Sequence, residues 1–113
     1  MNTEEAKQFV VAQGIGPDGL VVQARMGTDP GAAVFDQLIV ALRELTTSLA
    51  DQDLIEKELA LALFSLGVHV PSQYETWSNR GITFRSGLMG SDIYGLACAV
   101  ESVFVGEWIE CEE

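Results

Sequence analysis

The feature that most constrains the fold is an apolar stripe in the middle of the chain, where large hydrophobic residues recur at steps of three and four. This spacing places side chains on one face of a helix, whereas a half-buried strand needs a period of two. The charged residues Asp36, Arg43 and Glu44 fall off the stripe. The stripe consists of Phe35, Leu38, Ile39, Leu42, Leu45 and Leu49. It predicts an amphipathic helix that starts after 28-TDPG-31, a segment with capping residues and a proline suited to a first helical position.

A second helical pattern begins at Asp51 or Asp53, and Asp53 with Glu56 resembles the capping box that opens many helices. Gly67 suits the C-terminal cap of this helix. Its apolar residues form a core face (Ile55, Leu59, Ala62, Leu63, Leu66) and a flanking row (Leu54, Leu61, Phe64). Because the apolar sector is broad, we expect this helix to be central or to lie at an interface.

Helical patterns also cover the two ends of the chain. At the start, Thr3 suits an N-cap and Gly14 a C-terminus. Near the other end, Ser91 or Asp92 caps a long helix, and a shorter helix is expected within residues 72–81. The apolar stripe of the last helix is Ile93, Leu96, Val100, Val103 and Phe104.

Together these patterns predict a mainly α fold, a compact antiparallel bundle of four to five helices in a single domain spanning residues 1–113. Two short apolar segments, 20–26 and 82–84, leave an alternative open. Periodicity cannot distinguish a strand from a helical turn in so short a run, and the two segments could pair as a minor β element.

The chain is strongly acidic, with 17 Asp and Glu against six Lys and Arg and a formal net charge of −11. No basic residue follows Arg85. Such a field repels nucleic acid and anionic lipid and attracts basic proteins. The longest uncharged run, residues 59–74, is too short and too polar to span a membrane. We therefore expect neither direct nucleic-acid binding nor a membrane partner.

The N-terminal sequence and the cysteine content favour a reducing, cytoplasmic setting. The first residues, MNTEEAKQ, lack the basic start and apolar stretch of a signal peptide. The two cysteines, Cys98 and Cys111, are too few for a disulfide framework. Cys98 falls in an apolar helical pattern and is expected to be a small buried hydrophobic residue.

The stretch 14-GIGPDG-19 matches the G-x-G-x-x-G spacing of dinucleotide sites. That motif acts between a strand and a helix, with backbone N–H groups directed at the pyrophosphate. Here a helix is predicted before it, Pro17 removes one donor, and Asp18 would place negative charge beside the phosphates. We interpret the stretch as a turn and predict no nucleotide cofactor.

Candidate catalytic groups are few. The single histidine, His69, lies in an apolar context and favours a structural role over that of a base. A nucleophile pair of Cys98 with His69 is conceivable, but neither local sequence supports it. No metal-ligand spacing occurs, and the acids Asp51, Asp53 and Glu56 are explained by helix capping. The sequence predicts neither enzymatic activity nor a bound metal.

The order of four segments is similar to that of small bacterial immunity proteins, which are encoded beside polymorphic or contact-dependent toxins. The segments are 35-FDQLIVALREL-45, 54-LIEKELALALFSLG-67, 74-YETW-77 with Gly81, and 93-IYGLACAVESVFVGEW-108. The resemblance is one of helix rhythm over about two-thirds of the chain. It implies a non-enzymatic cytoplasmic protein that binds one toxin domain tightly, and it assigns no individual contact.

The charge leads independently to the same class of function. Many nuclease toxins are basic because they hold phosphates, and an acidic domain could cover that surface with fast, electrostatically steered association. Aromatic side chains would then anchor the interface. We expect Tyr74 and Trp77 to be these anchors. The carboxylates expected to bind the partner are Asp51, Asp53, Glu56, Glu58, Glu101 and Glu107.

Two alternatives remain at the sequence level. The broad apolar face of the second helix is consistent with a homodimeric structural or adaptor protein of unknown partner. A pocket near His69, Trp77 and Cys98 is consistent with a small enzyme or ligand-binding protein.

Overall fold

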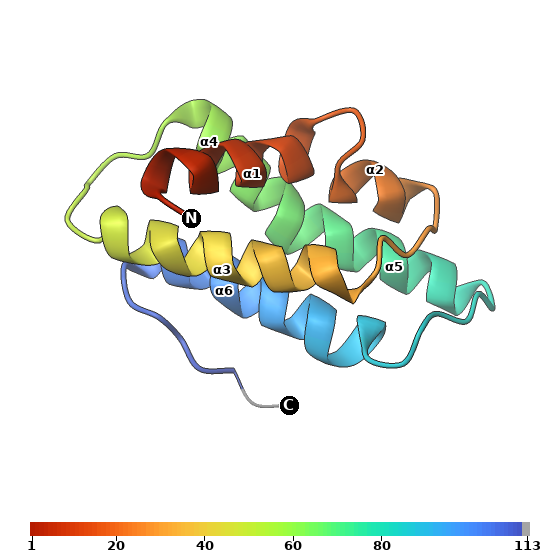
Figure 1. Ribbon diagram of the computed structural model, residues 1–113. Coiled ribbons are helices and arrows are strands. Elements are labelled where there is room, and N and C mark those ends of the chain that lie inside the picture. The colour runs from red at the N-terminus through yellow and green to blue at the C-terminus, as the bar shows by residue number, and fades with distance from the viewer. Residues whose placement is uncertain (112–113) are drawn as a thin grey trace.

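The computed structural model describes residues 1–111, which form a mainly α fold measuring 43 × 31 × 21 Å along its principal axes (Figure 1). The elements are α1 (Thr3–Ile15), α2 (Leu20–Arg25), α3 (Ala32–Ser48), α4 (Lys57–Phe64), the π-helical segment η1 (Ser65–His69), α5 (Val70–Asn79), the π-helical segment η2 (Leu88–Asp92) and α6 (Ile93–Val105). Consecutive numbering shows that α4, η1 and α5 are one continuous helical rod, and that η2 leads directly into α6. The predicted fold class is confirmed, and the described residues contain no strand.

The long helices alternate in direction along the chain, but they do not all pack on the helix that follows them. α3 packs against α1 and α6, and α1 packs against α4. α3 and α4 are not among the closely packed pairs, so residues 49–56 carry the chain across the end of the bundle from α3 to α4 (Figure 1). This crossing makes the loop the outermost covering of that end.

The core is continuous, and two glycines allow its closest helix approaches. A Cβ on Gly14 would lie 2.6 Å from the Ala62 Cα, and one on Gly67 would lie 3.0 Å from a Val100 methyl. The sequence prediction of both glycines as helix ends is wrong. Gly14 lies within α1 and Gly67 lies within η1, because their missing side chains let α1 meet α4 and η1 meet α6.

Several predicted helix starts are displaced. α1 is capped by Asn2, whose side chain accepts from the Glu5 N–H, rather than by Thr3. The capping box of Asp53 and Glu56 is wrong, since α4 begins at Lys57 without a side-chain cap. The diagonal crossing explains the difference, because a helix starting at Asp51 could not also span the end of the bundle.

The two segments left open at the sequence level contain no β structure. Residues 20–25 are the short helix α2, and residues 82–84 have no regular secondary structure. Between α1 and α2 the Gly19 N–H donates to the Gly16 carbonyl at 3.2 Å, as expected for the predicted turn. The glycine-rich stretch is therefore preceded by a helix, not by the strand that a dinucleotide site requires.

The predicted last helix begins earlier than Ser91, at Leu88 of η2, after Gly87 in the left-handed conformation. No side-chain cap is formed, because the Asp92 carboxylate accepts from Arg85 instead. Within residues 1–111, the one helix long and apolar enough to cross a membrane by length and composition is Leu88–Val105, of which 44% is buried in the fold. Its buried side packs on α3 and η1, as for the core helix of a bundle.

Beyond α6, residues 106–111 fold back along the helix, and Cys111 forms a disulfide with Cys98. The two Cα atoms are 6.1 Å apart, within the range that a disulfide spans. The expectation that Cys98 is an unpaired apolar residue is wrong: its side chain is buried, but as half of a cystine. We call residues 106–111 the C-terminal strap.

Candidate functional site: the acidic end of the bundle

Four elements meet at the end of the bundle that the 49–56 loop covers. Thr3 of α1 donates its hydroxyl to the Glu44 carboxylate of α3 at 3.1 Å, and Lys7 of α1 pairs with Glu56 at 3.0 Å. Gly106, directly after α6, lies against Ala50: a Cβ there would be 3.3 Å from the Ala50 carbonyl oxygen. The start of α1, the ends of α3 and α6, and the loop before α4 therefore form one surface (Figure 1).

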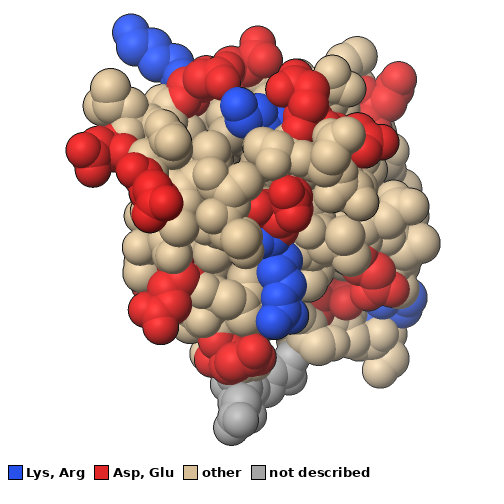
Figure 2. Space-filling view, turned by 60° about the vertical axis from the view of Figure 1, so that its left-hand side comes forward, with Lys and Arg blue, Asp and Glu red and all other residues tan. Residues whose placement is uncertain are grey.

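Carboxylates dominate this surface, which we call the acidic end. Asp51, Asp53 and Glu56 lie on the crossing loop and Glu58 lies in the first turn of α4. All four are exposed. Further exposed carboxylates of the same end are Glu4, Glu5 and Glu107. Figure 2 shows acidic side chains distributed around this part of the surface, with few basic ones between them.

The basic residues of the acidic end are largely occupied. Lys7 pairs with Glu56, and the Arg43 guanidinium lies over the Trp108 ring, 5.0 Å from its centroid. Lys57 remains on the surface without an ion pair among the described residues. Because most of the carboxylates have no cationic neighbour, this end offers a concentrated negative potential to a partner.

A protruding leucine lies among the acids. Leu54 is 87% exposed, the most exposed large hydrophobic side chain in residues 1–111, whereas its neighbour Ile55 packs against the core. The chain is non-helical here, so adjacent side chains point to opposite sides and only one of the pair can be buried. Phe104 and Val105, at the nearby end of α6, are also more than half exposed.

Two shallow hollows flank the loop. One, of about 280 Å³, lies between α1 and α4 and is lined by Glu4, Lys7, Gln8, Val11, Ala12, Glu56, Glu58 and Leu59. The other, of about 360 Å³, lies under the loop and is lined by Lys7, Leu49, Gln52, Leu54, Ile55, Glu56 and Leu59. Both include the Lys7–Glu56 ion pair. The acidic end is thus uneven, with recesses beside a protruding apolar side chain.

The structure brings most of the predicted carboxylates together. Asp51, Asp53, Glu56 and Glu58 share one end of the bundle, and Glu107 lies next to Gly106, which contacts the same loop. Glu101 is exposed on α6 about one turn before its end, so it lies at the border of this surface.

The predicted anchor Tyr74 is corrected, because its side chain is fully buried. Its hydroxyl donates to the Thr28 carbonyl at 2.7 Å, and its ring meets Phe84 edge-on at a centroid distance of 5.2 Å. Burial raises the pKa of Tyr74 well above its usual range. A side chain enclosed in this way holds the fold together and cannot contact a partner.

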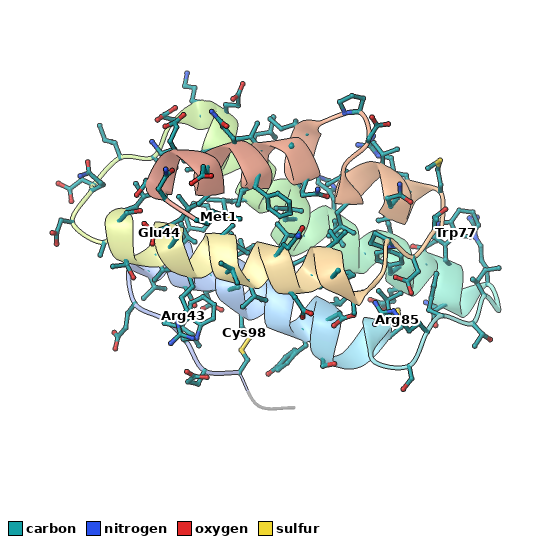
Figure 3. The ribbon with its side chains drawn as sticks, viewed as in Figure 1. Met1, Arg43, Glu44, Trp77, Arg85 and Cys98 are labelled. Atoms are coloured by element: carbon teal, nitrogen blue, oxygen red, sulfur yellow. A yellow bond between two sulfur atoms is a disulfide. The ribbon has the colours of Figure 1, made fainter. Side chains whose placement is uncertain are left out.

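Trp77 is also placed away from the acids, at the opposite end of the molecule (Figure 3). It is partly buried, its indole N–H donates to the carbonyls of Ala24 and Arg25, and Arg80 lies over its ring. The residue therefore joins α5 to α2. The apolar residue beside the predicted acids is instead Leu54, whose position between Asp53 and Glu56 was the available signal in the sequence.

The opposite end, which we call the arginine end, neutralises its own charge. Arg85 donates to Asp29 through Nε at 2.8 Å and through Nη2 at 3.2 Å, and to Asp92 through Nη2 at 2.6 Å. The hydrogen bonds from Arg85 lower the pKa of Asp29, and the two carboxylates raise the pKa of Arg85. These charges are bound to each other and not to a partner.

The residues of the proposed small-molecule pocket do not assemble. Cys98 is oxidised to a cystine and cannot act as a nucleophile in this state, and His69 is exposed with its ring edge against Phe64. In the part of the chain that the structure describes, no three His, Cys, Asp or Glu side chains are grouped to hold a metal ion. A Cys98–His69 pair is therefore ruled out for the disulfide-bonded protein.

Comparison with known proteins adds no assignment: no family model, curated protein or solved structure matches the chain. Function is therefore argued from the geometry and charge of the acidic end.

Proposed function

We propose that this protein is a non-enzymatic binding protein whose acidic end covers a basic partner surface, most plausibly that of a toxin domain which it neutralises. The observation that carries the proposal is the crossing loop, where three exposed carboxylates surround the exposed side chain of Leu54. Carboxylates accelerate encounter with a cationic surface, and a central apolar side chain slows dissociation by filling a pocket. Cytoplasmic residence in the producing cell belongs to the same proposal.

A basic nuclease domain is the class of toxin that fits best. Its active-site cleft must attract phosphates and is therefore lined with Lys and Arg. An acidic surface of the kind described here presents carboxylates where the nucleic acid would present phosphates. Occupation of the cleft would inhibit the toxin without any reaction on the part of the inhibitor.

The test is association with the catalytically inactivated C-terminal domain of a secreted protein encoded beside this chain. The site variant is Asp51→Asn/Asp53→Asn/Glu58→Gln, which leaves the Lys7–Glu56 pair intact. The matched control is Asp18→Asn/Asp36→Asn/Glu75→Gln, which removes the same charge from exposed carboxylates elsewhere. We expect the site variant to lower the association rate constant by about tenfold at low salt and the control to change it less than twofold.

Two outcomes contradict the proposal. Equal effects of the two variants would show that only net charge matters and not the acidic end. A gene neighbourhood without any toxin-like domain, together with no protection against basic nuclease domains in co-expression, would remove the neutralising role.

A second candidate function, a homodimeric structural or adaptor protein, is favoured by a different surface. Leu61, Phe64 and Val68 follow one another along α4 and η1, and each is at least half exposed. They lie within the uncharged run 59–74, where two acidic copies could approach without repulsion. Sedimentation equilibrium distinguishes the two: a dimer at micromolar concentration that Phe64→Glu dissociates supports this alternative, and a monomer excludes it.

A further inference from the structure

The C-terminal strap is attached along α6 by two contacts in register. The Ile109 N–H donates to Ser102 Oγ at 2.9 Å, and Cys111 is bonded to Cys98. Cys98 and Ser102 are four residues apart and lie on one face of the helix, while the strap advances from residue 109 to residue 111. The strap therefore runs antiparallel to α6, with Trp108 directed to Arg43 of α3 (Figure 3).

Apart from the disulfide, little holds the strap. Trp108 is partly buried against the core, with a cation–π contact to Arg43, and a single hydrogen bond reaches the strap backbone from Ser102. A cation–π contact at an exposed site and one hydrogen bond return less free energy than six ordered residues cost in backbone entropy. The disulfide is therefore the contact on which the closed strap depends.

We propose that the Cys98–Cys111 disulfide is a redox modification site, which takes dithiol reductants as its substrate class and opens the strap when reduced. The two sulfurs differ in access. Cys98 is 9% exposed beneath the strap, whereas Cys111 is only partly buried at its outer end. A reductant approaching from solvent meets Cys111 first.

The exchange proceeds in two displacements. A thiolate of the dithiol attacks Cys111 Sγ, the bond between the two cysteines breaks, and Cys98 leaves as a thiolate that takes a proton from solvent. The second thiol of the reductant, once deprotonated, attacks the sulfur of its own partner in the mixed disulfide and releases Cys111 as a thiolate, which is also protonated. The dithiol is oxidised to a disulfide by two electrons, and the cystine is reduced to two thiols.

Opening has a local consequence. Ser102 is fully buried while its hydroxyl accepts from Ile109 and donates to the Cys98 carbonyl at 2.8 Å. Release of the strap replaces the Ile109 contact with water, uncovers this face of α6 and frees Trp108 from Arg43. The helices beneath keep their own packing, since α3 and α6 contact each other directly.

The test measures hydrogen exchange of the Ile109 amide in the full chain, before and after reduction by dithiothreitol. We expect exchange to accelerate at least tenfold on reduction, while amides within α1 and α3 keep their protection. Cys111→Ser should show the open behaviour without any reductant. Ser86→Ala, which leaves the cystine and strap intact, is the control and should behave as the unaltered chain.

Access is tested separately with single-cysteine variants. Cys111 in the Cys98→Ser chain should react with a maleimide at least tenfold faster than Cys98 in the Cys111→Ser chain. Three results would overturn the proposal: two reactive thiols in the protein purified without reductant, an Ile109 amide that stays protected after reduction, or loss of protection throughout α1 and α3. The last would show that the disulfide maintains the whole fold and not the strap.

Discussion

The two ends of the bundle treat charge in opposite ways. At the arginine end, Arg85 lies between Asp29 and Asp92 and donates three hydrogen bonds to them. At the acidic end, the carboxylates of Asp51 and Asp53 point into solvent with no ion pair. Charges that satisfy each other serve the stability of the fold, whereas charges left without partners are available to another molecule. The difference separates residues whose loss should cost stability from residues whose loss should cost binding.

Replacing the central cation of the arginine end should have the largest effect on stability. Arg85→Met leaves two partly buried carboxylates facing each other, and we expect the free energy of unfolding to fall by about 2 kcal/mol. Arg80→Met is the control, because Arg80 stacks on Trp77 and contacts no carboxylate; it should lose about 0.5 kcal/mol. Urea denaturation measures both, and equal losses would show that the Arg85 network is not special.

The buried tyrosine should follow. Tyr74→Phe removes the hydroxyl that donates to the Thr28 carbonyl, and we expect a loss of about 1 kcal/mol, since the carbonyl is left without that donor. Tyr94→Phe, on the exposed side of α6, should change stability by less than about 0.5 kcal/mol. A loss at Tyr94 as large as that at Tyr74 would contradict the structural role assigned to the buried hydroxyl.

A pH dependence should mark Asp29. Because hydrogen bonds from Arg85 lower the pKa of Asp29 in the folded state, its charged form stabilises the fold above the unfolded pKa of about 4. That contribution is lost as the pH falls through the lower folded pKa. The stability difference between the unaltered chain and Asp29→Asn should therefore be full at pH 6 and shrink below pH 4. A difference that stays constant down to pH 2 would contradict the pairing.

The smallest effect on stability is expected at the acidic end. The variant Asp51→Asn/Asp53→Asn/Glu58→Gln removes like charges that have no ion-pair partners, so the free energy of unfolding should stay within about 0.5 kcal/mol or rise slightly. The same urea denaturation measures it. A clear loss of stability would mean that these carboxylates are bound within the fold and are not available to a partner.

The sequence predicted the helices better than it predicted their ends. The stripe from Phe35 to Leu45 and that of the last helix both face the core, because a helical period is a local property. The start of α4 was not predictable from its capping pattern, since it depends on which helices pack side by side. The crossing from α3 to α4 is set by Gly14 against Ala62, a contact between segments far apart in sequence.

The candidate site divides in the same way. Clustering of the loop carboxylates follows from their closeness in the sequence, so composition alone indicated it. The anchor could not be inferred, because an aromatic residue is equally suited to a core and to an interface. Tyr74 is fully enclosed while Leu54 protrudes, and burial depends on the packing of the whole chain.

The most direct test of the charge asymmetry compares a cationic with an anionic nitroxide of equal size, by their paramagnetic relaxation enhancement at each backbone amide. If the negative potential is concentrated at the acidic end, the cationic probe should relax the amides of residues 50–58 in excess of the anionic one, and this excess should be several times larger than at residues 80–92. Equal excess at the two ends, or a larger excess around Arg85, would contradict the central claim that only one end offers its charge to a partner.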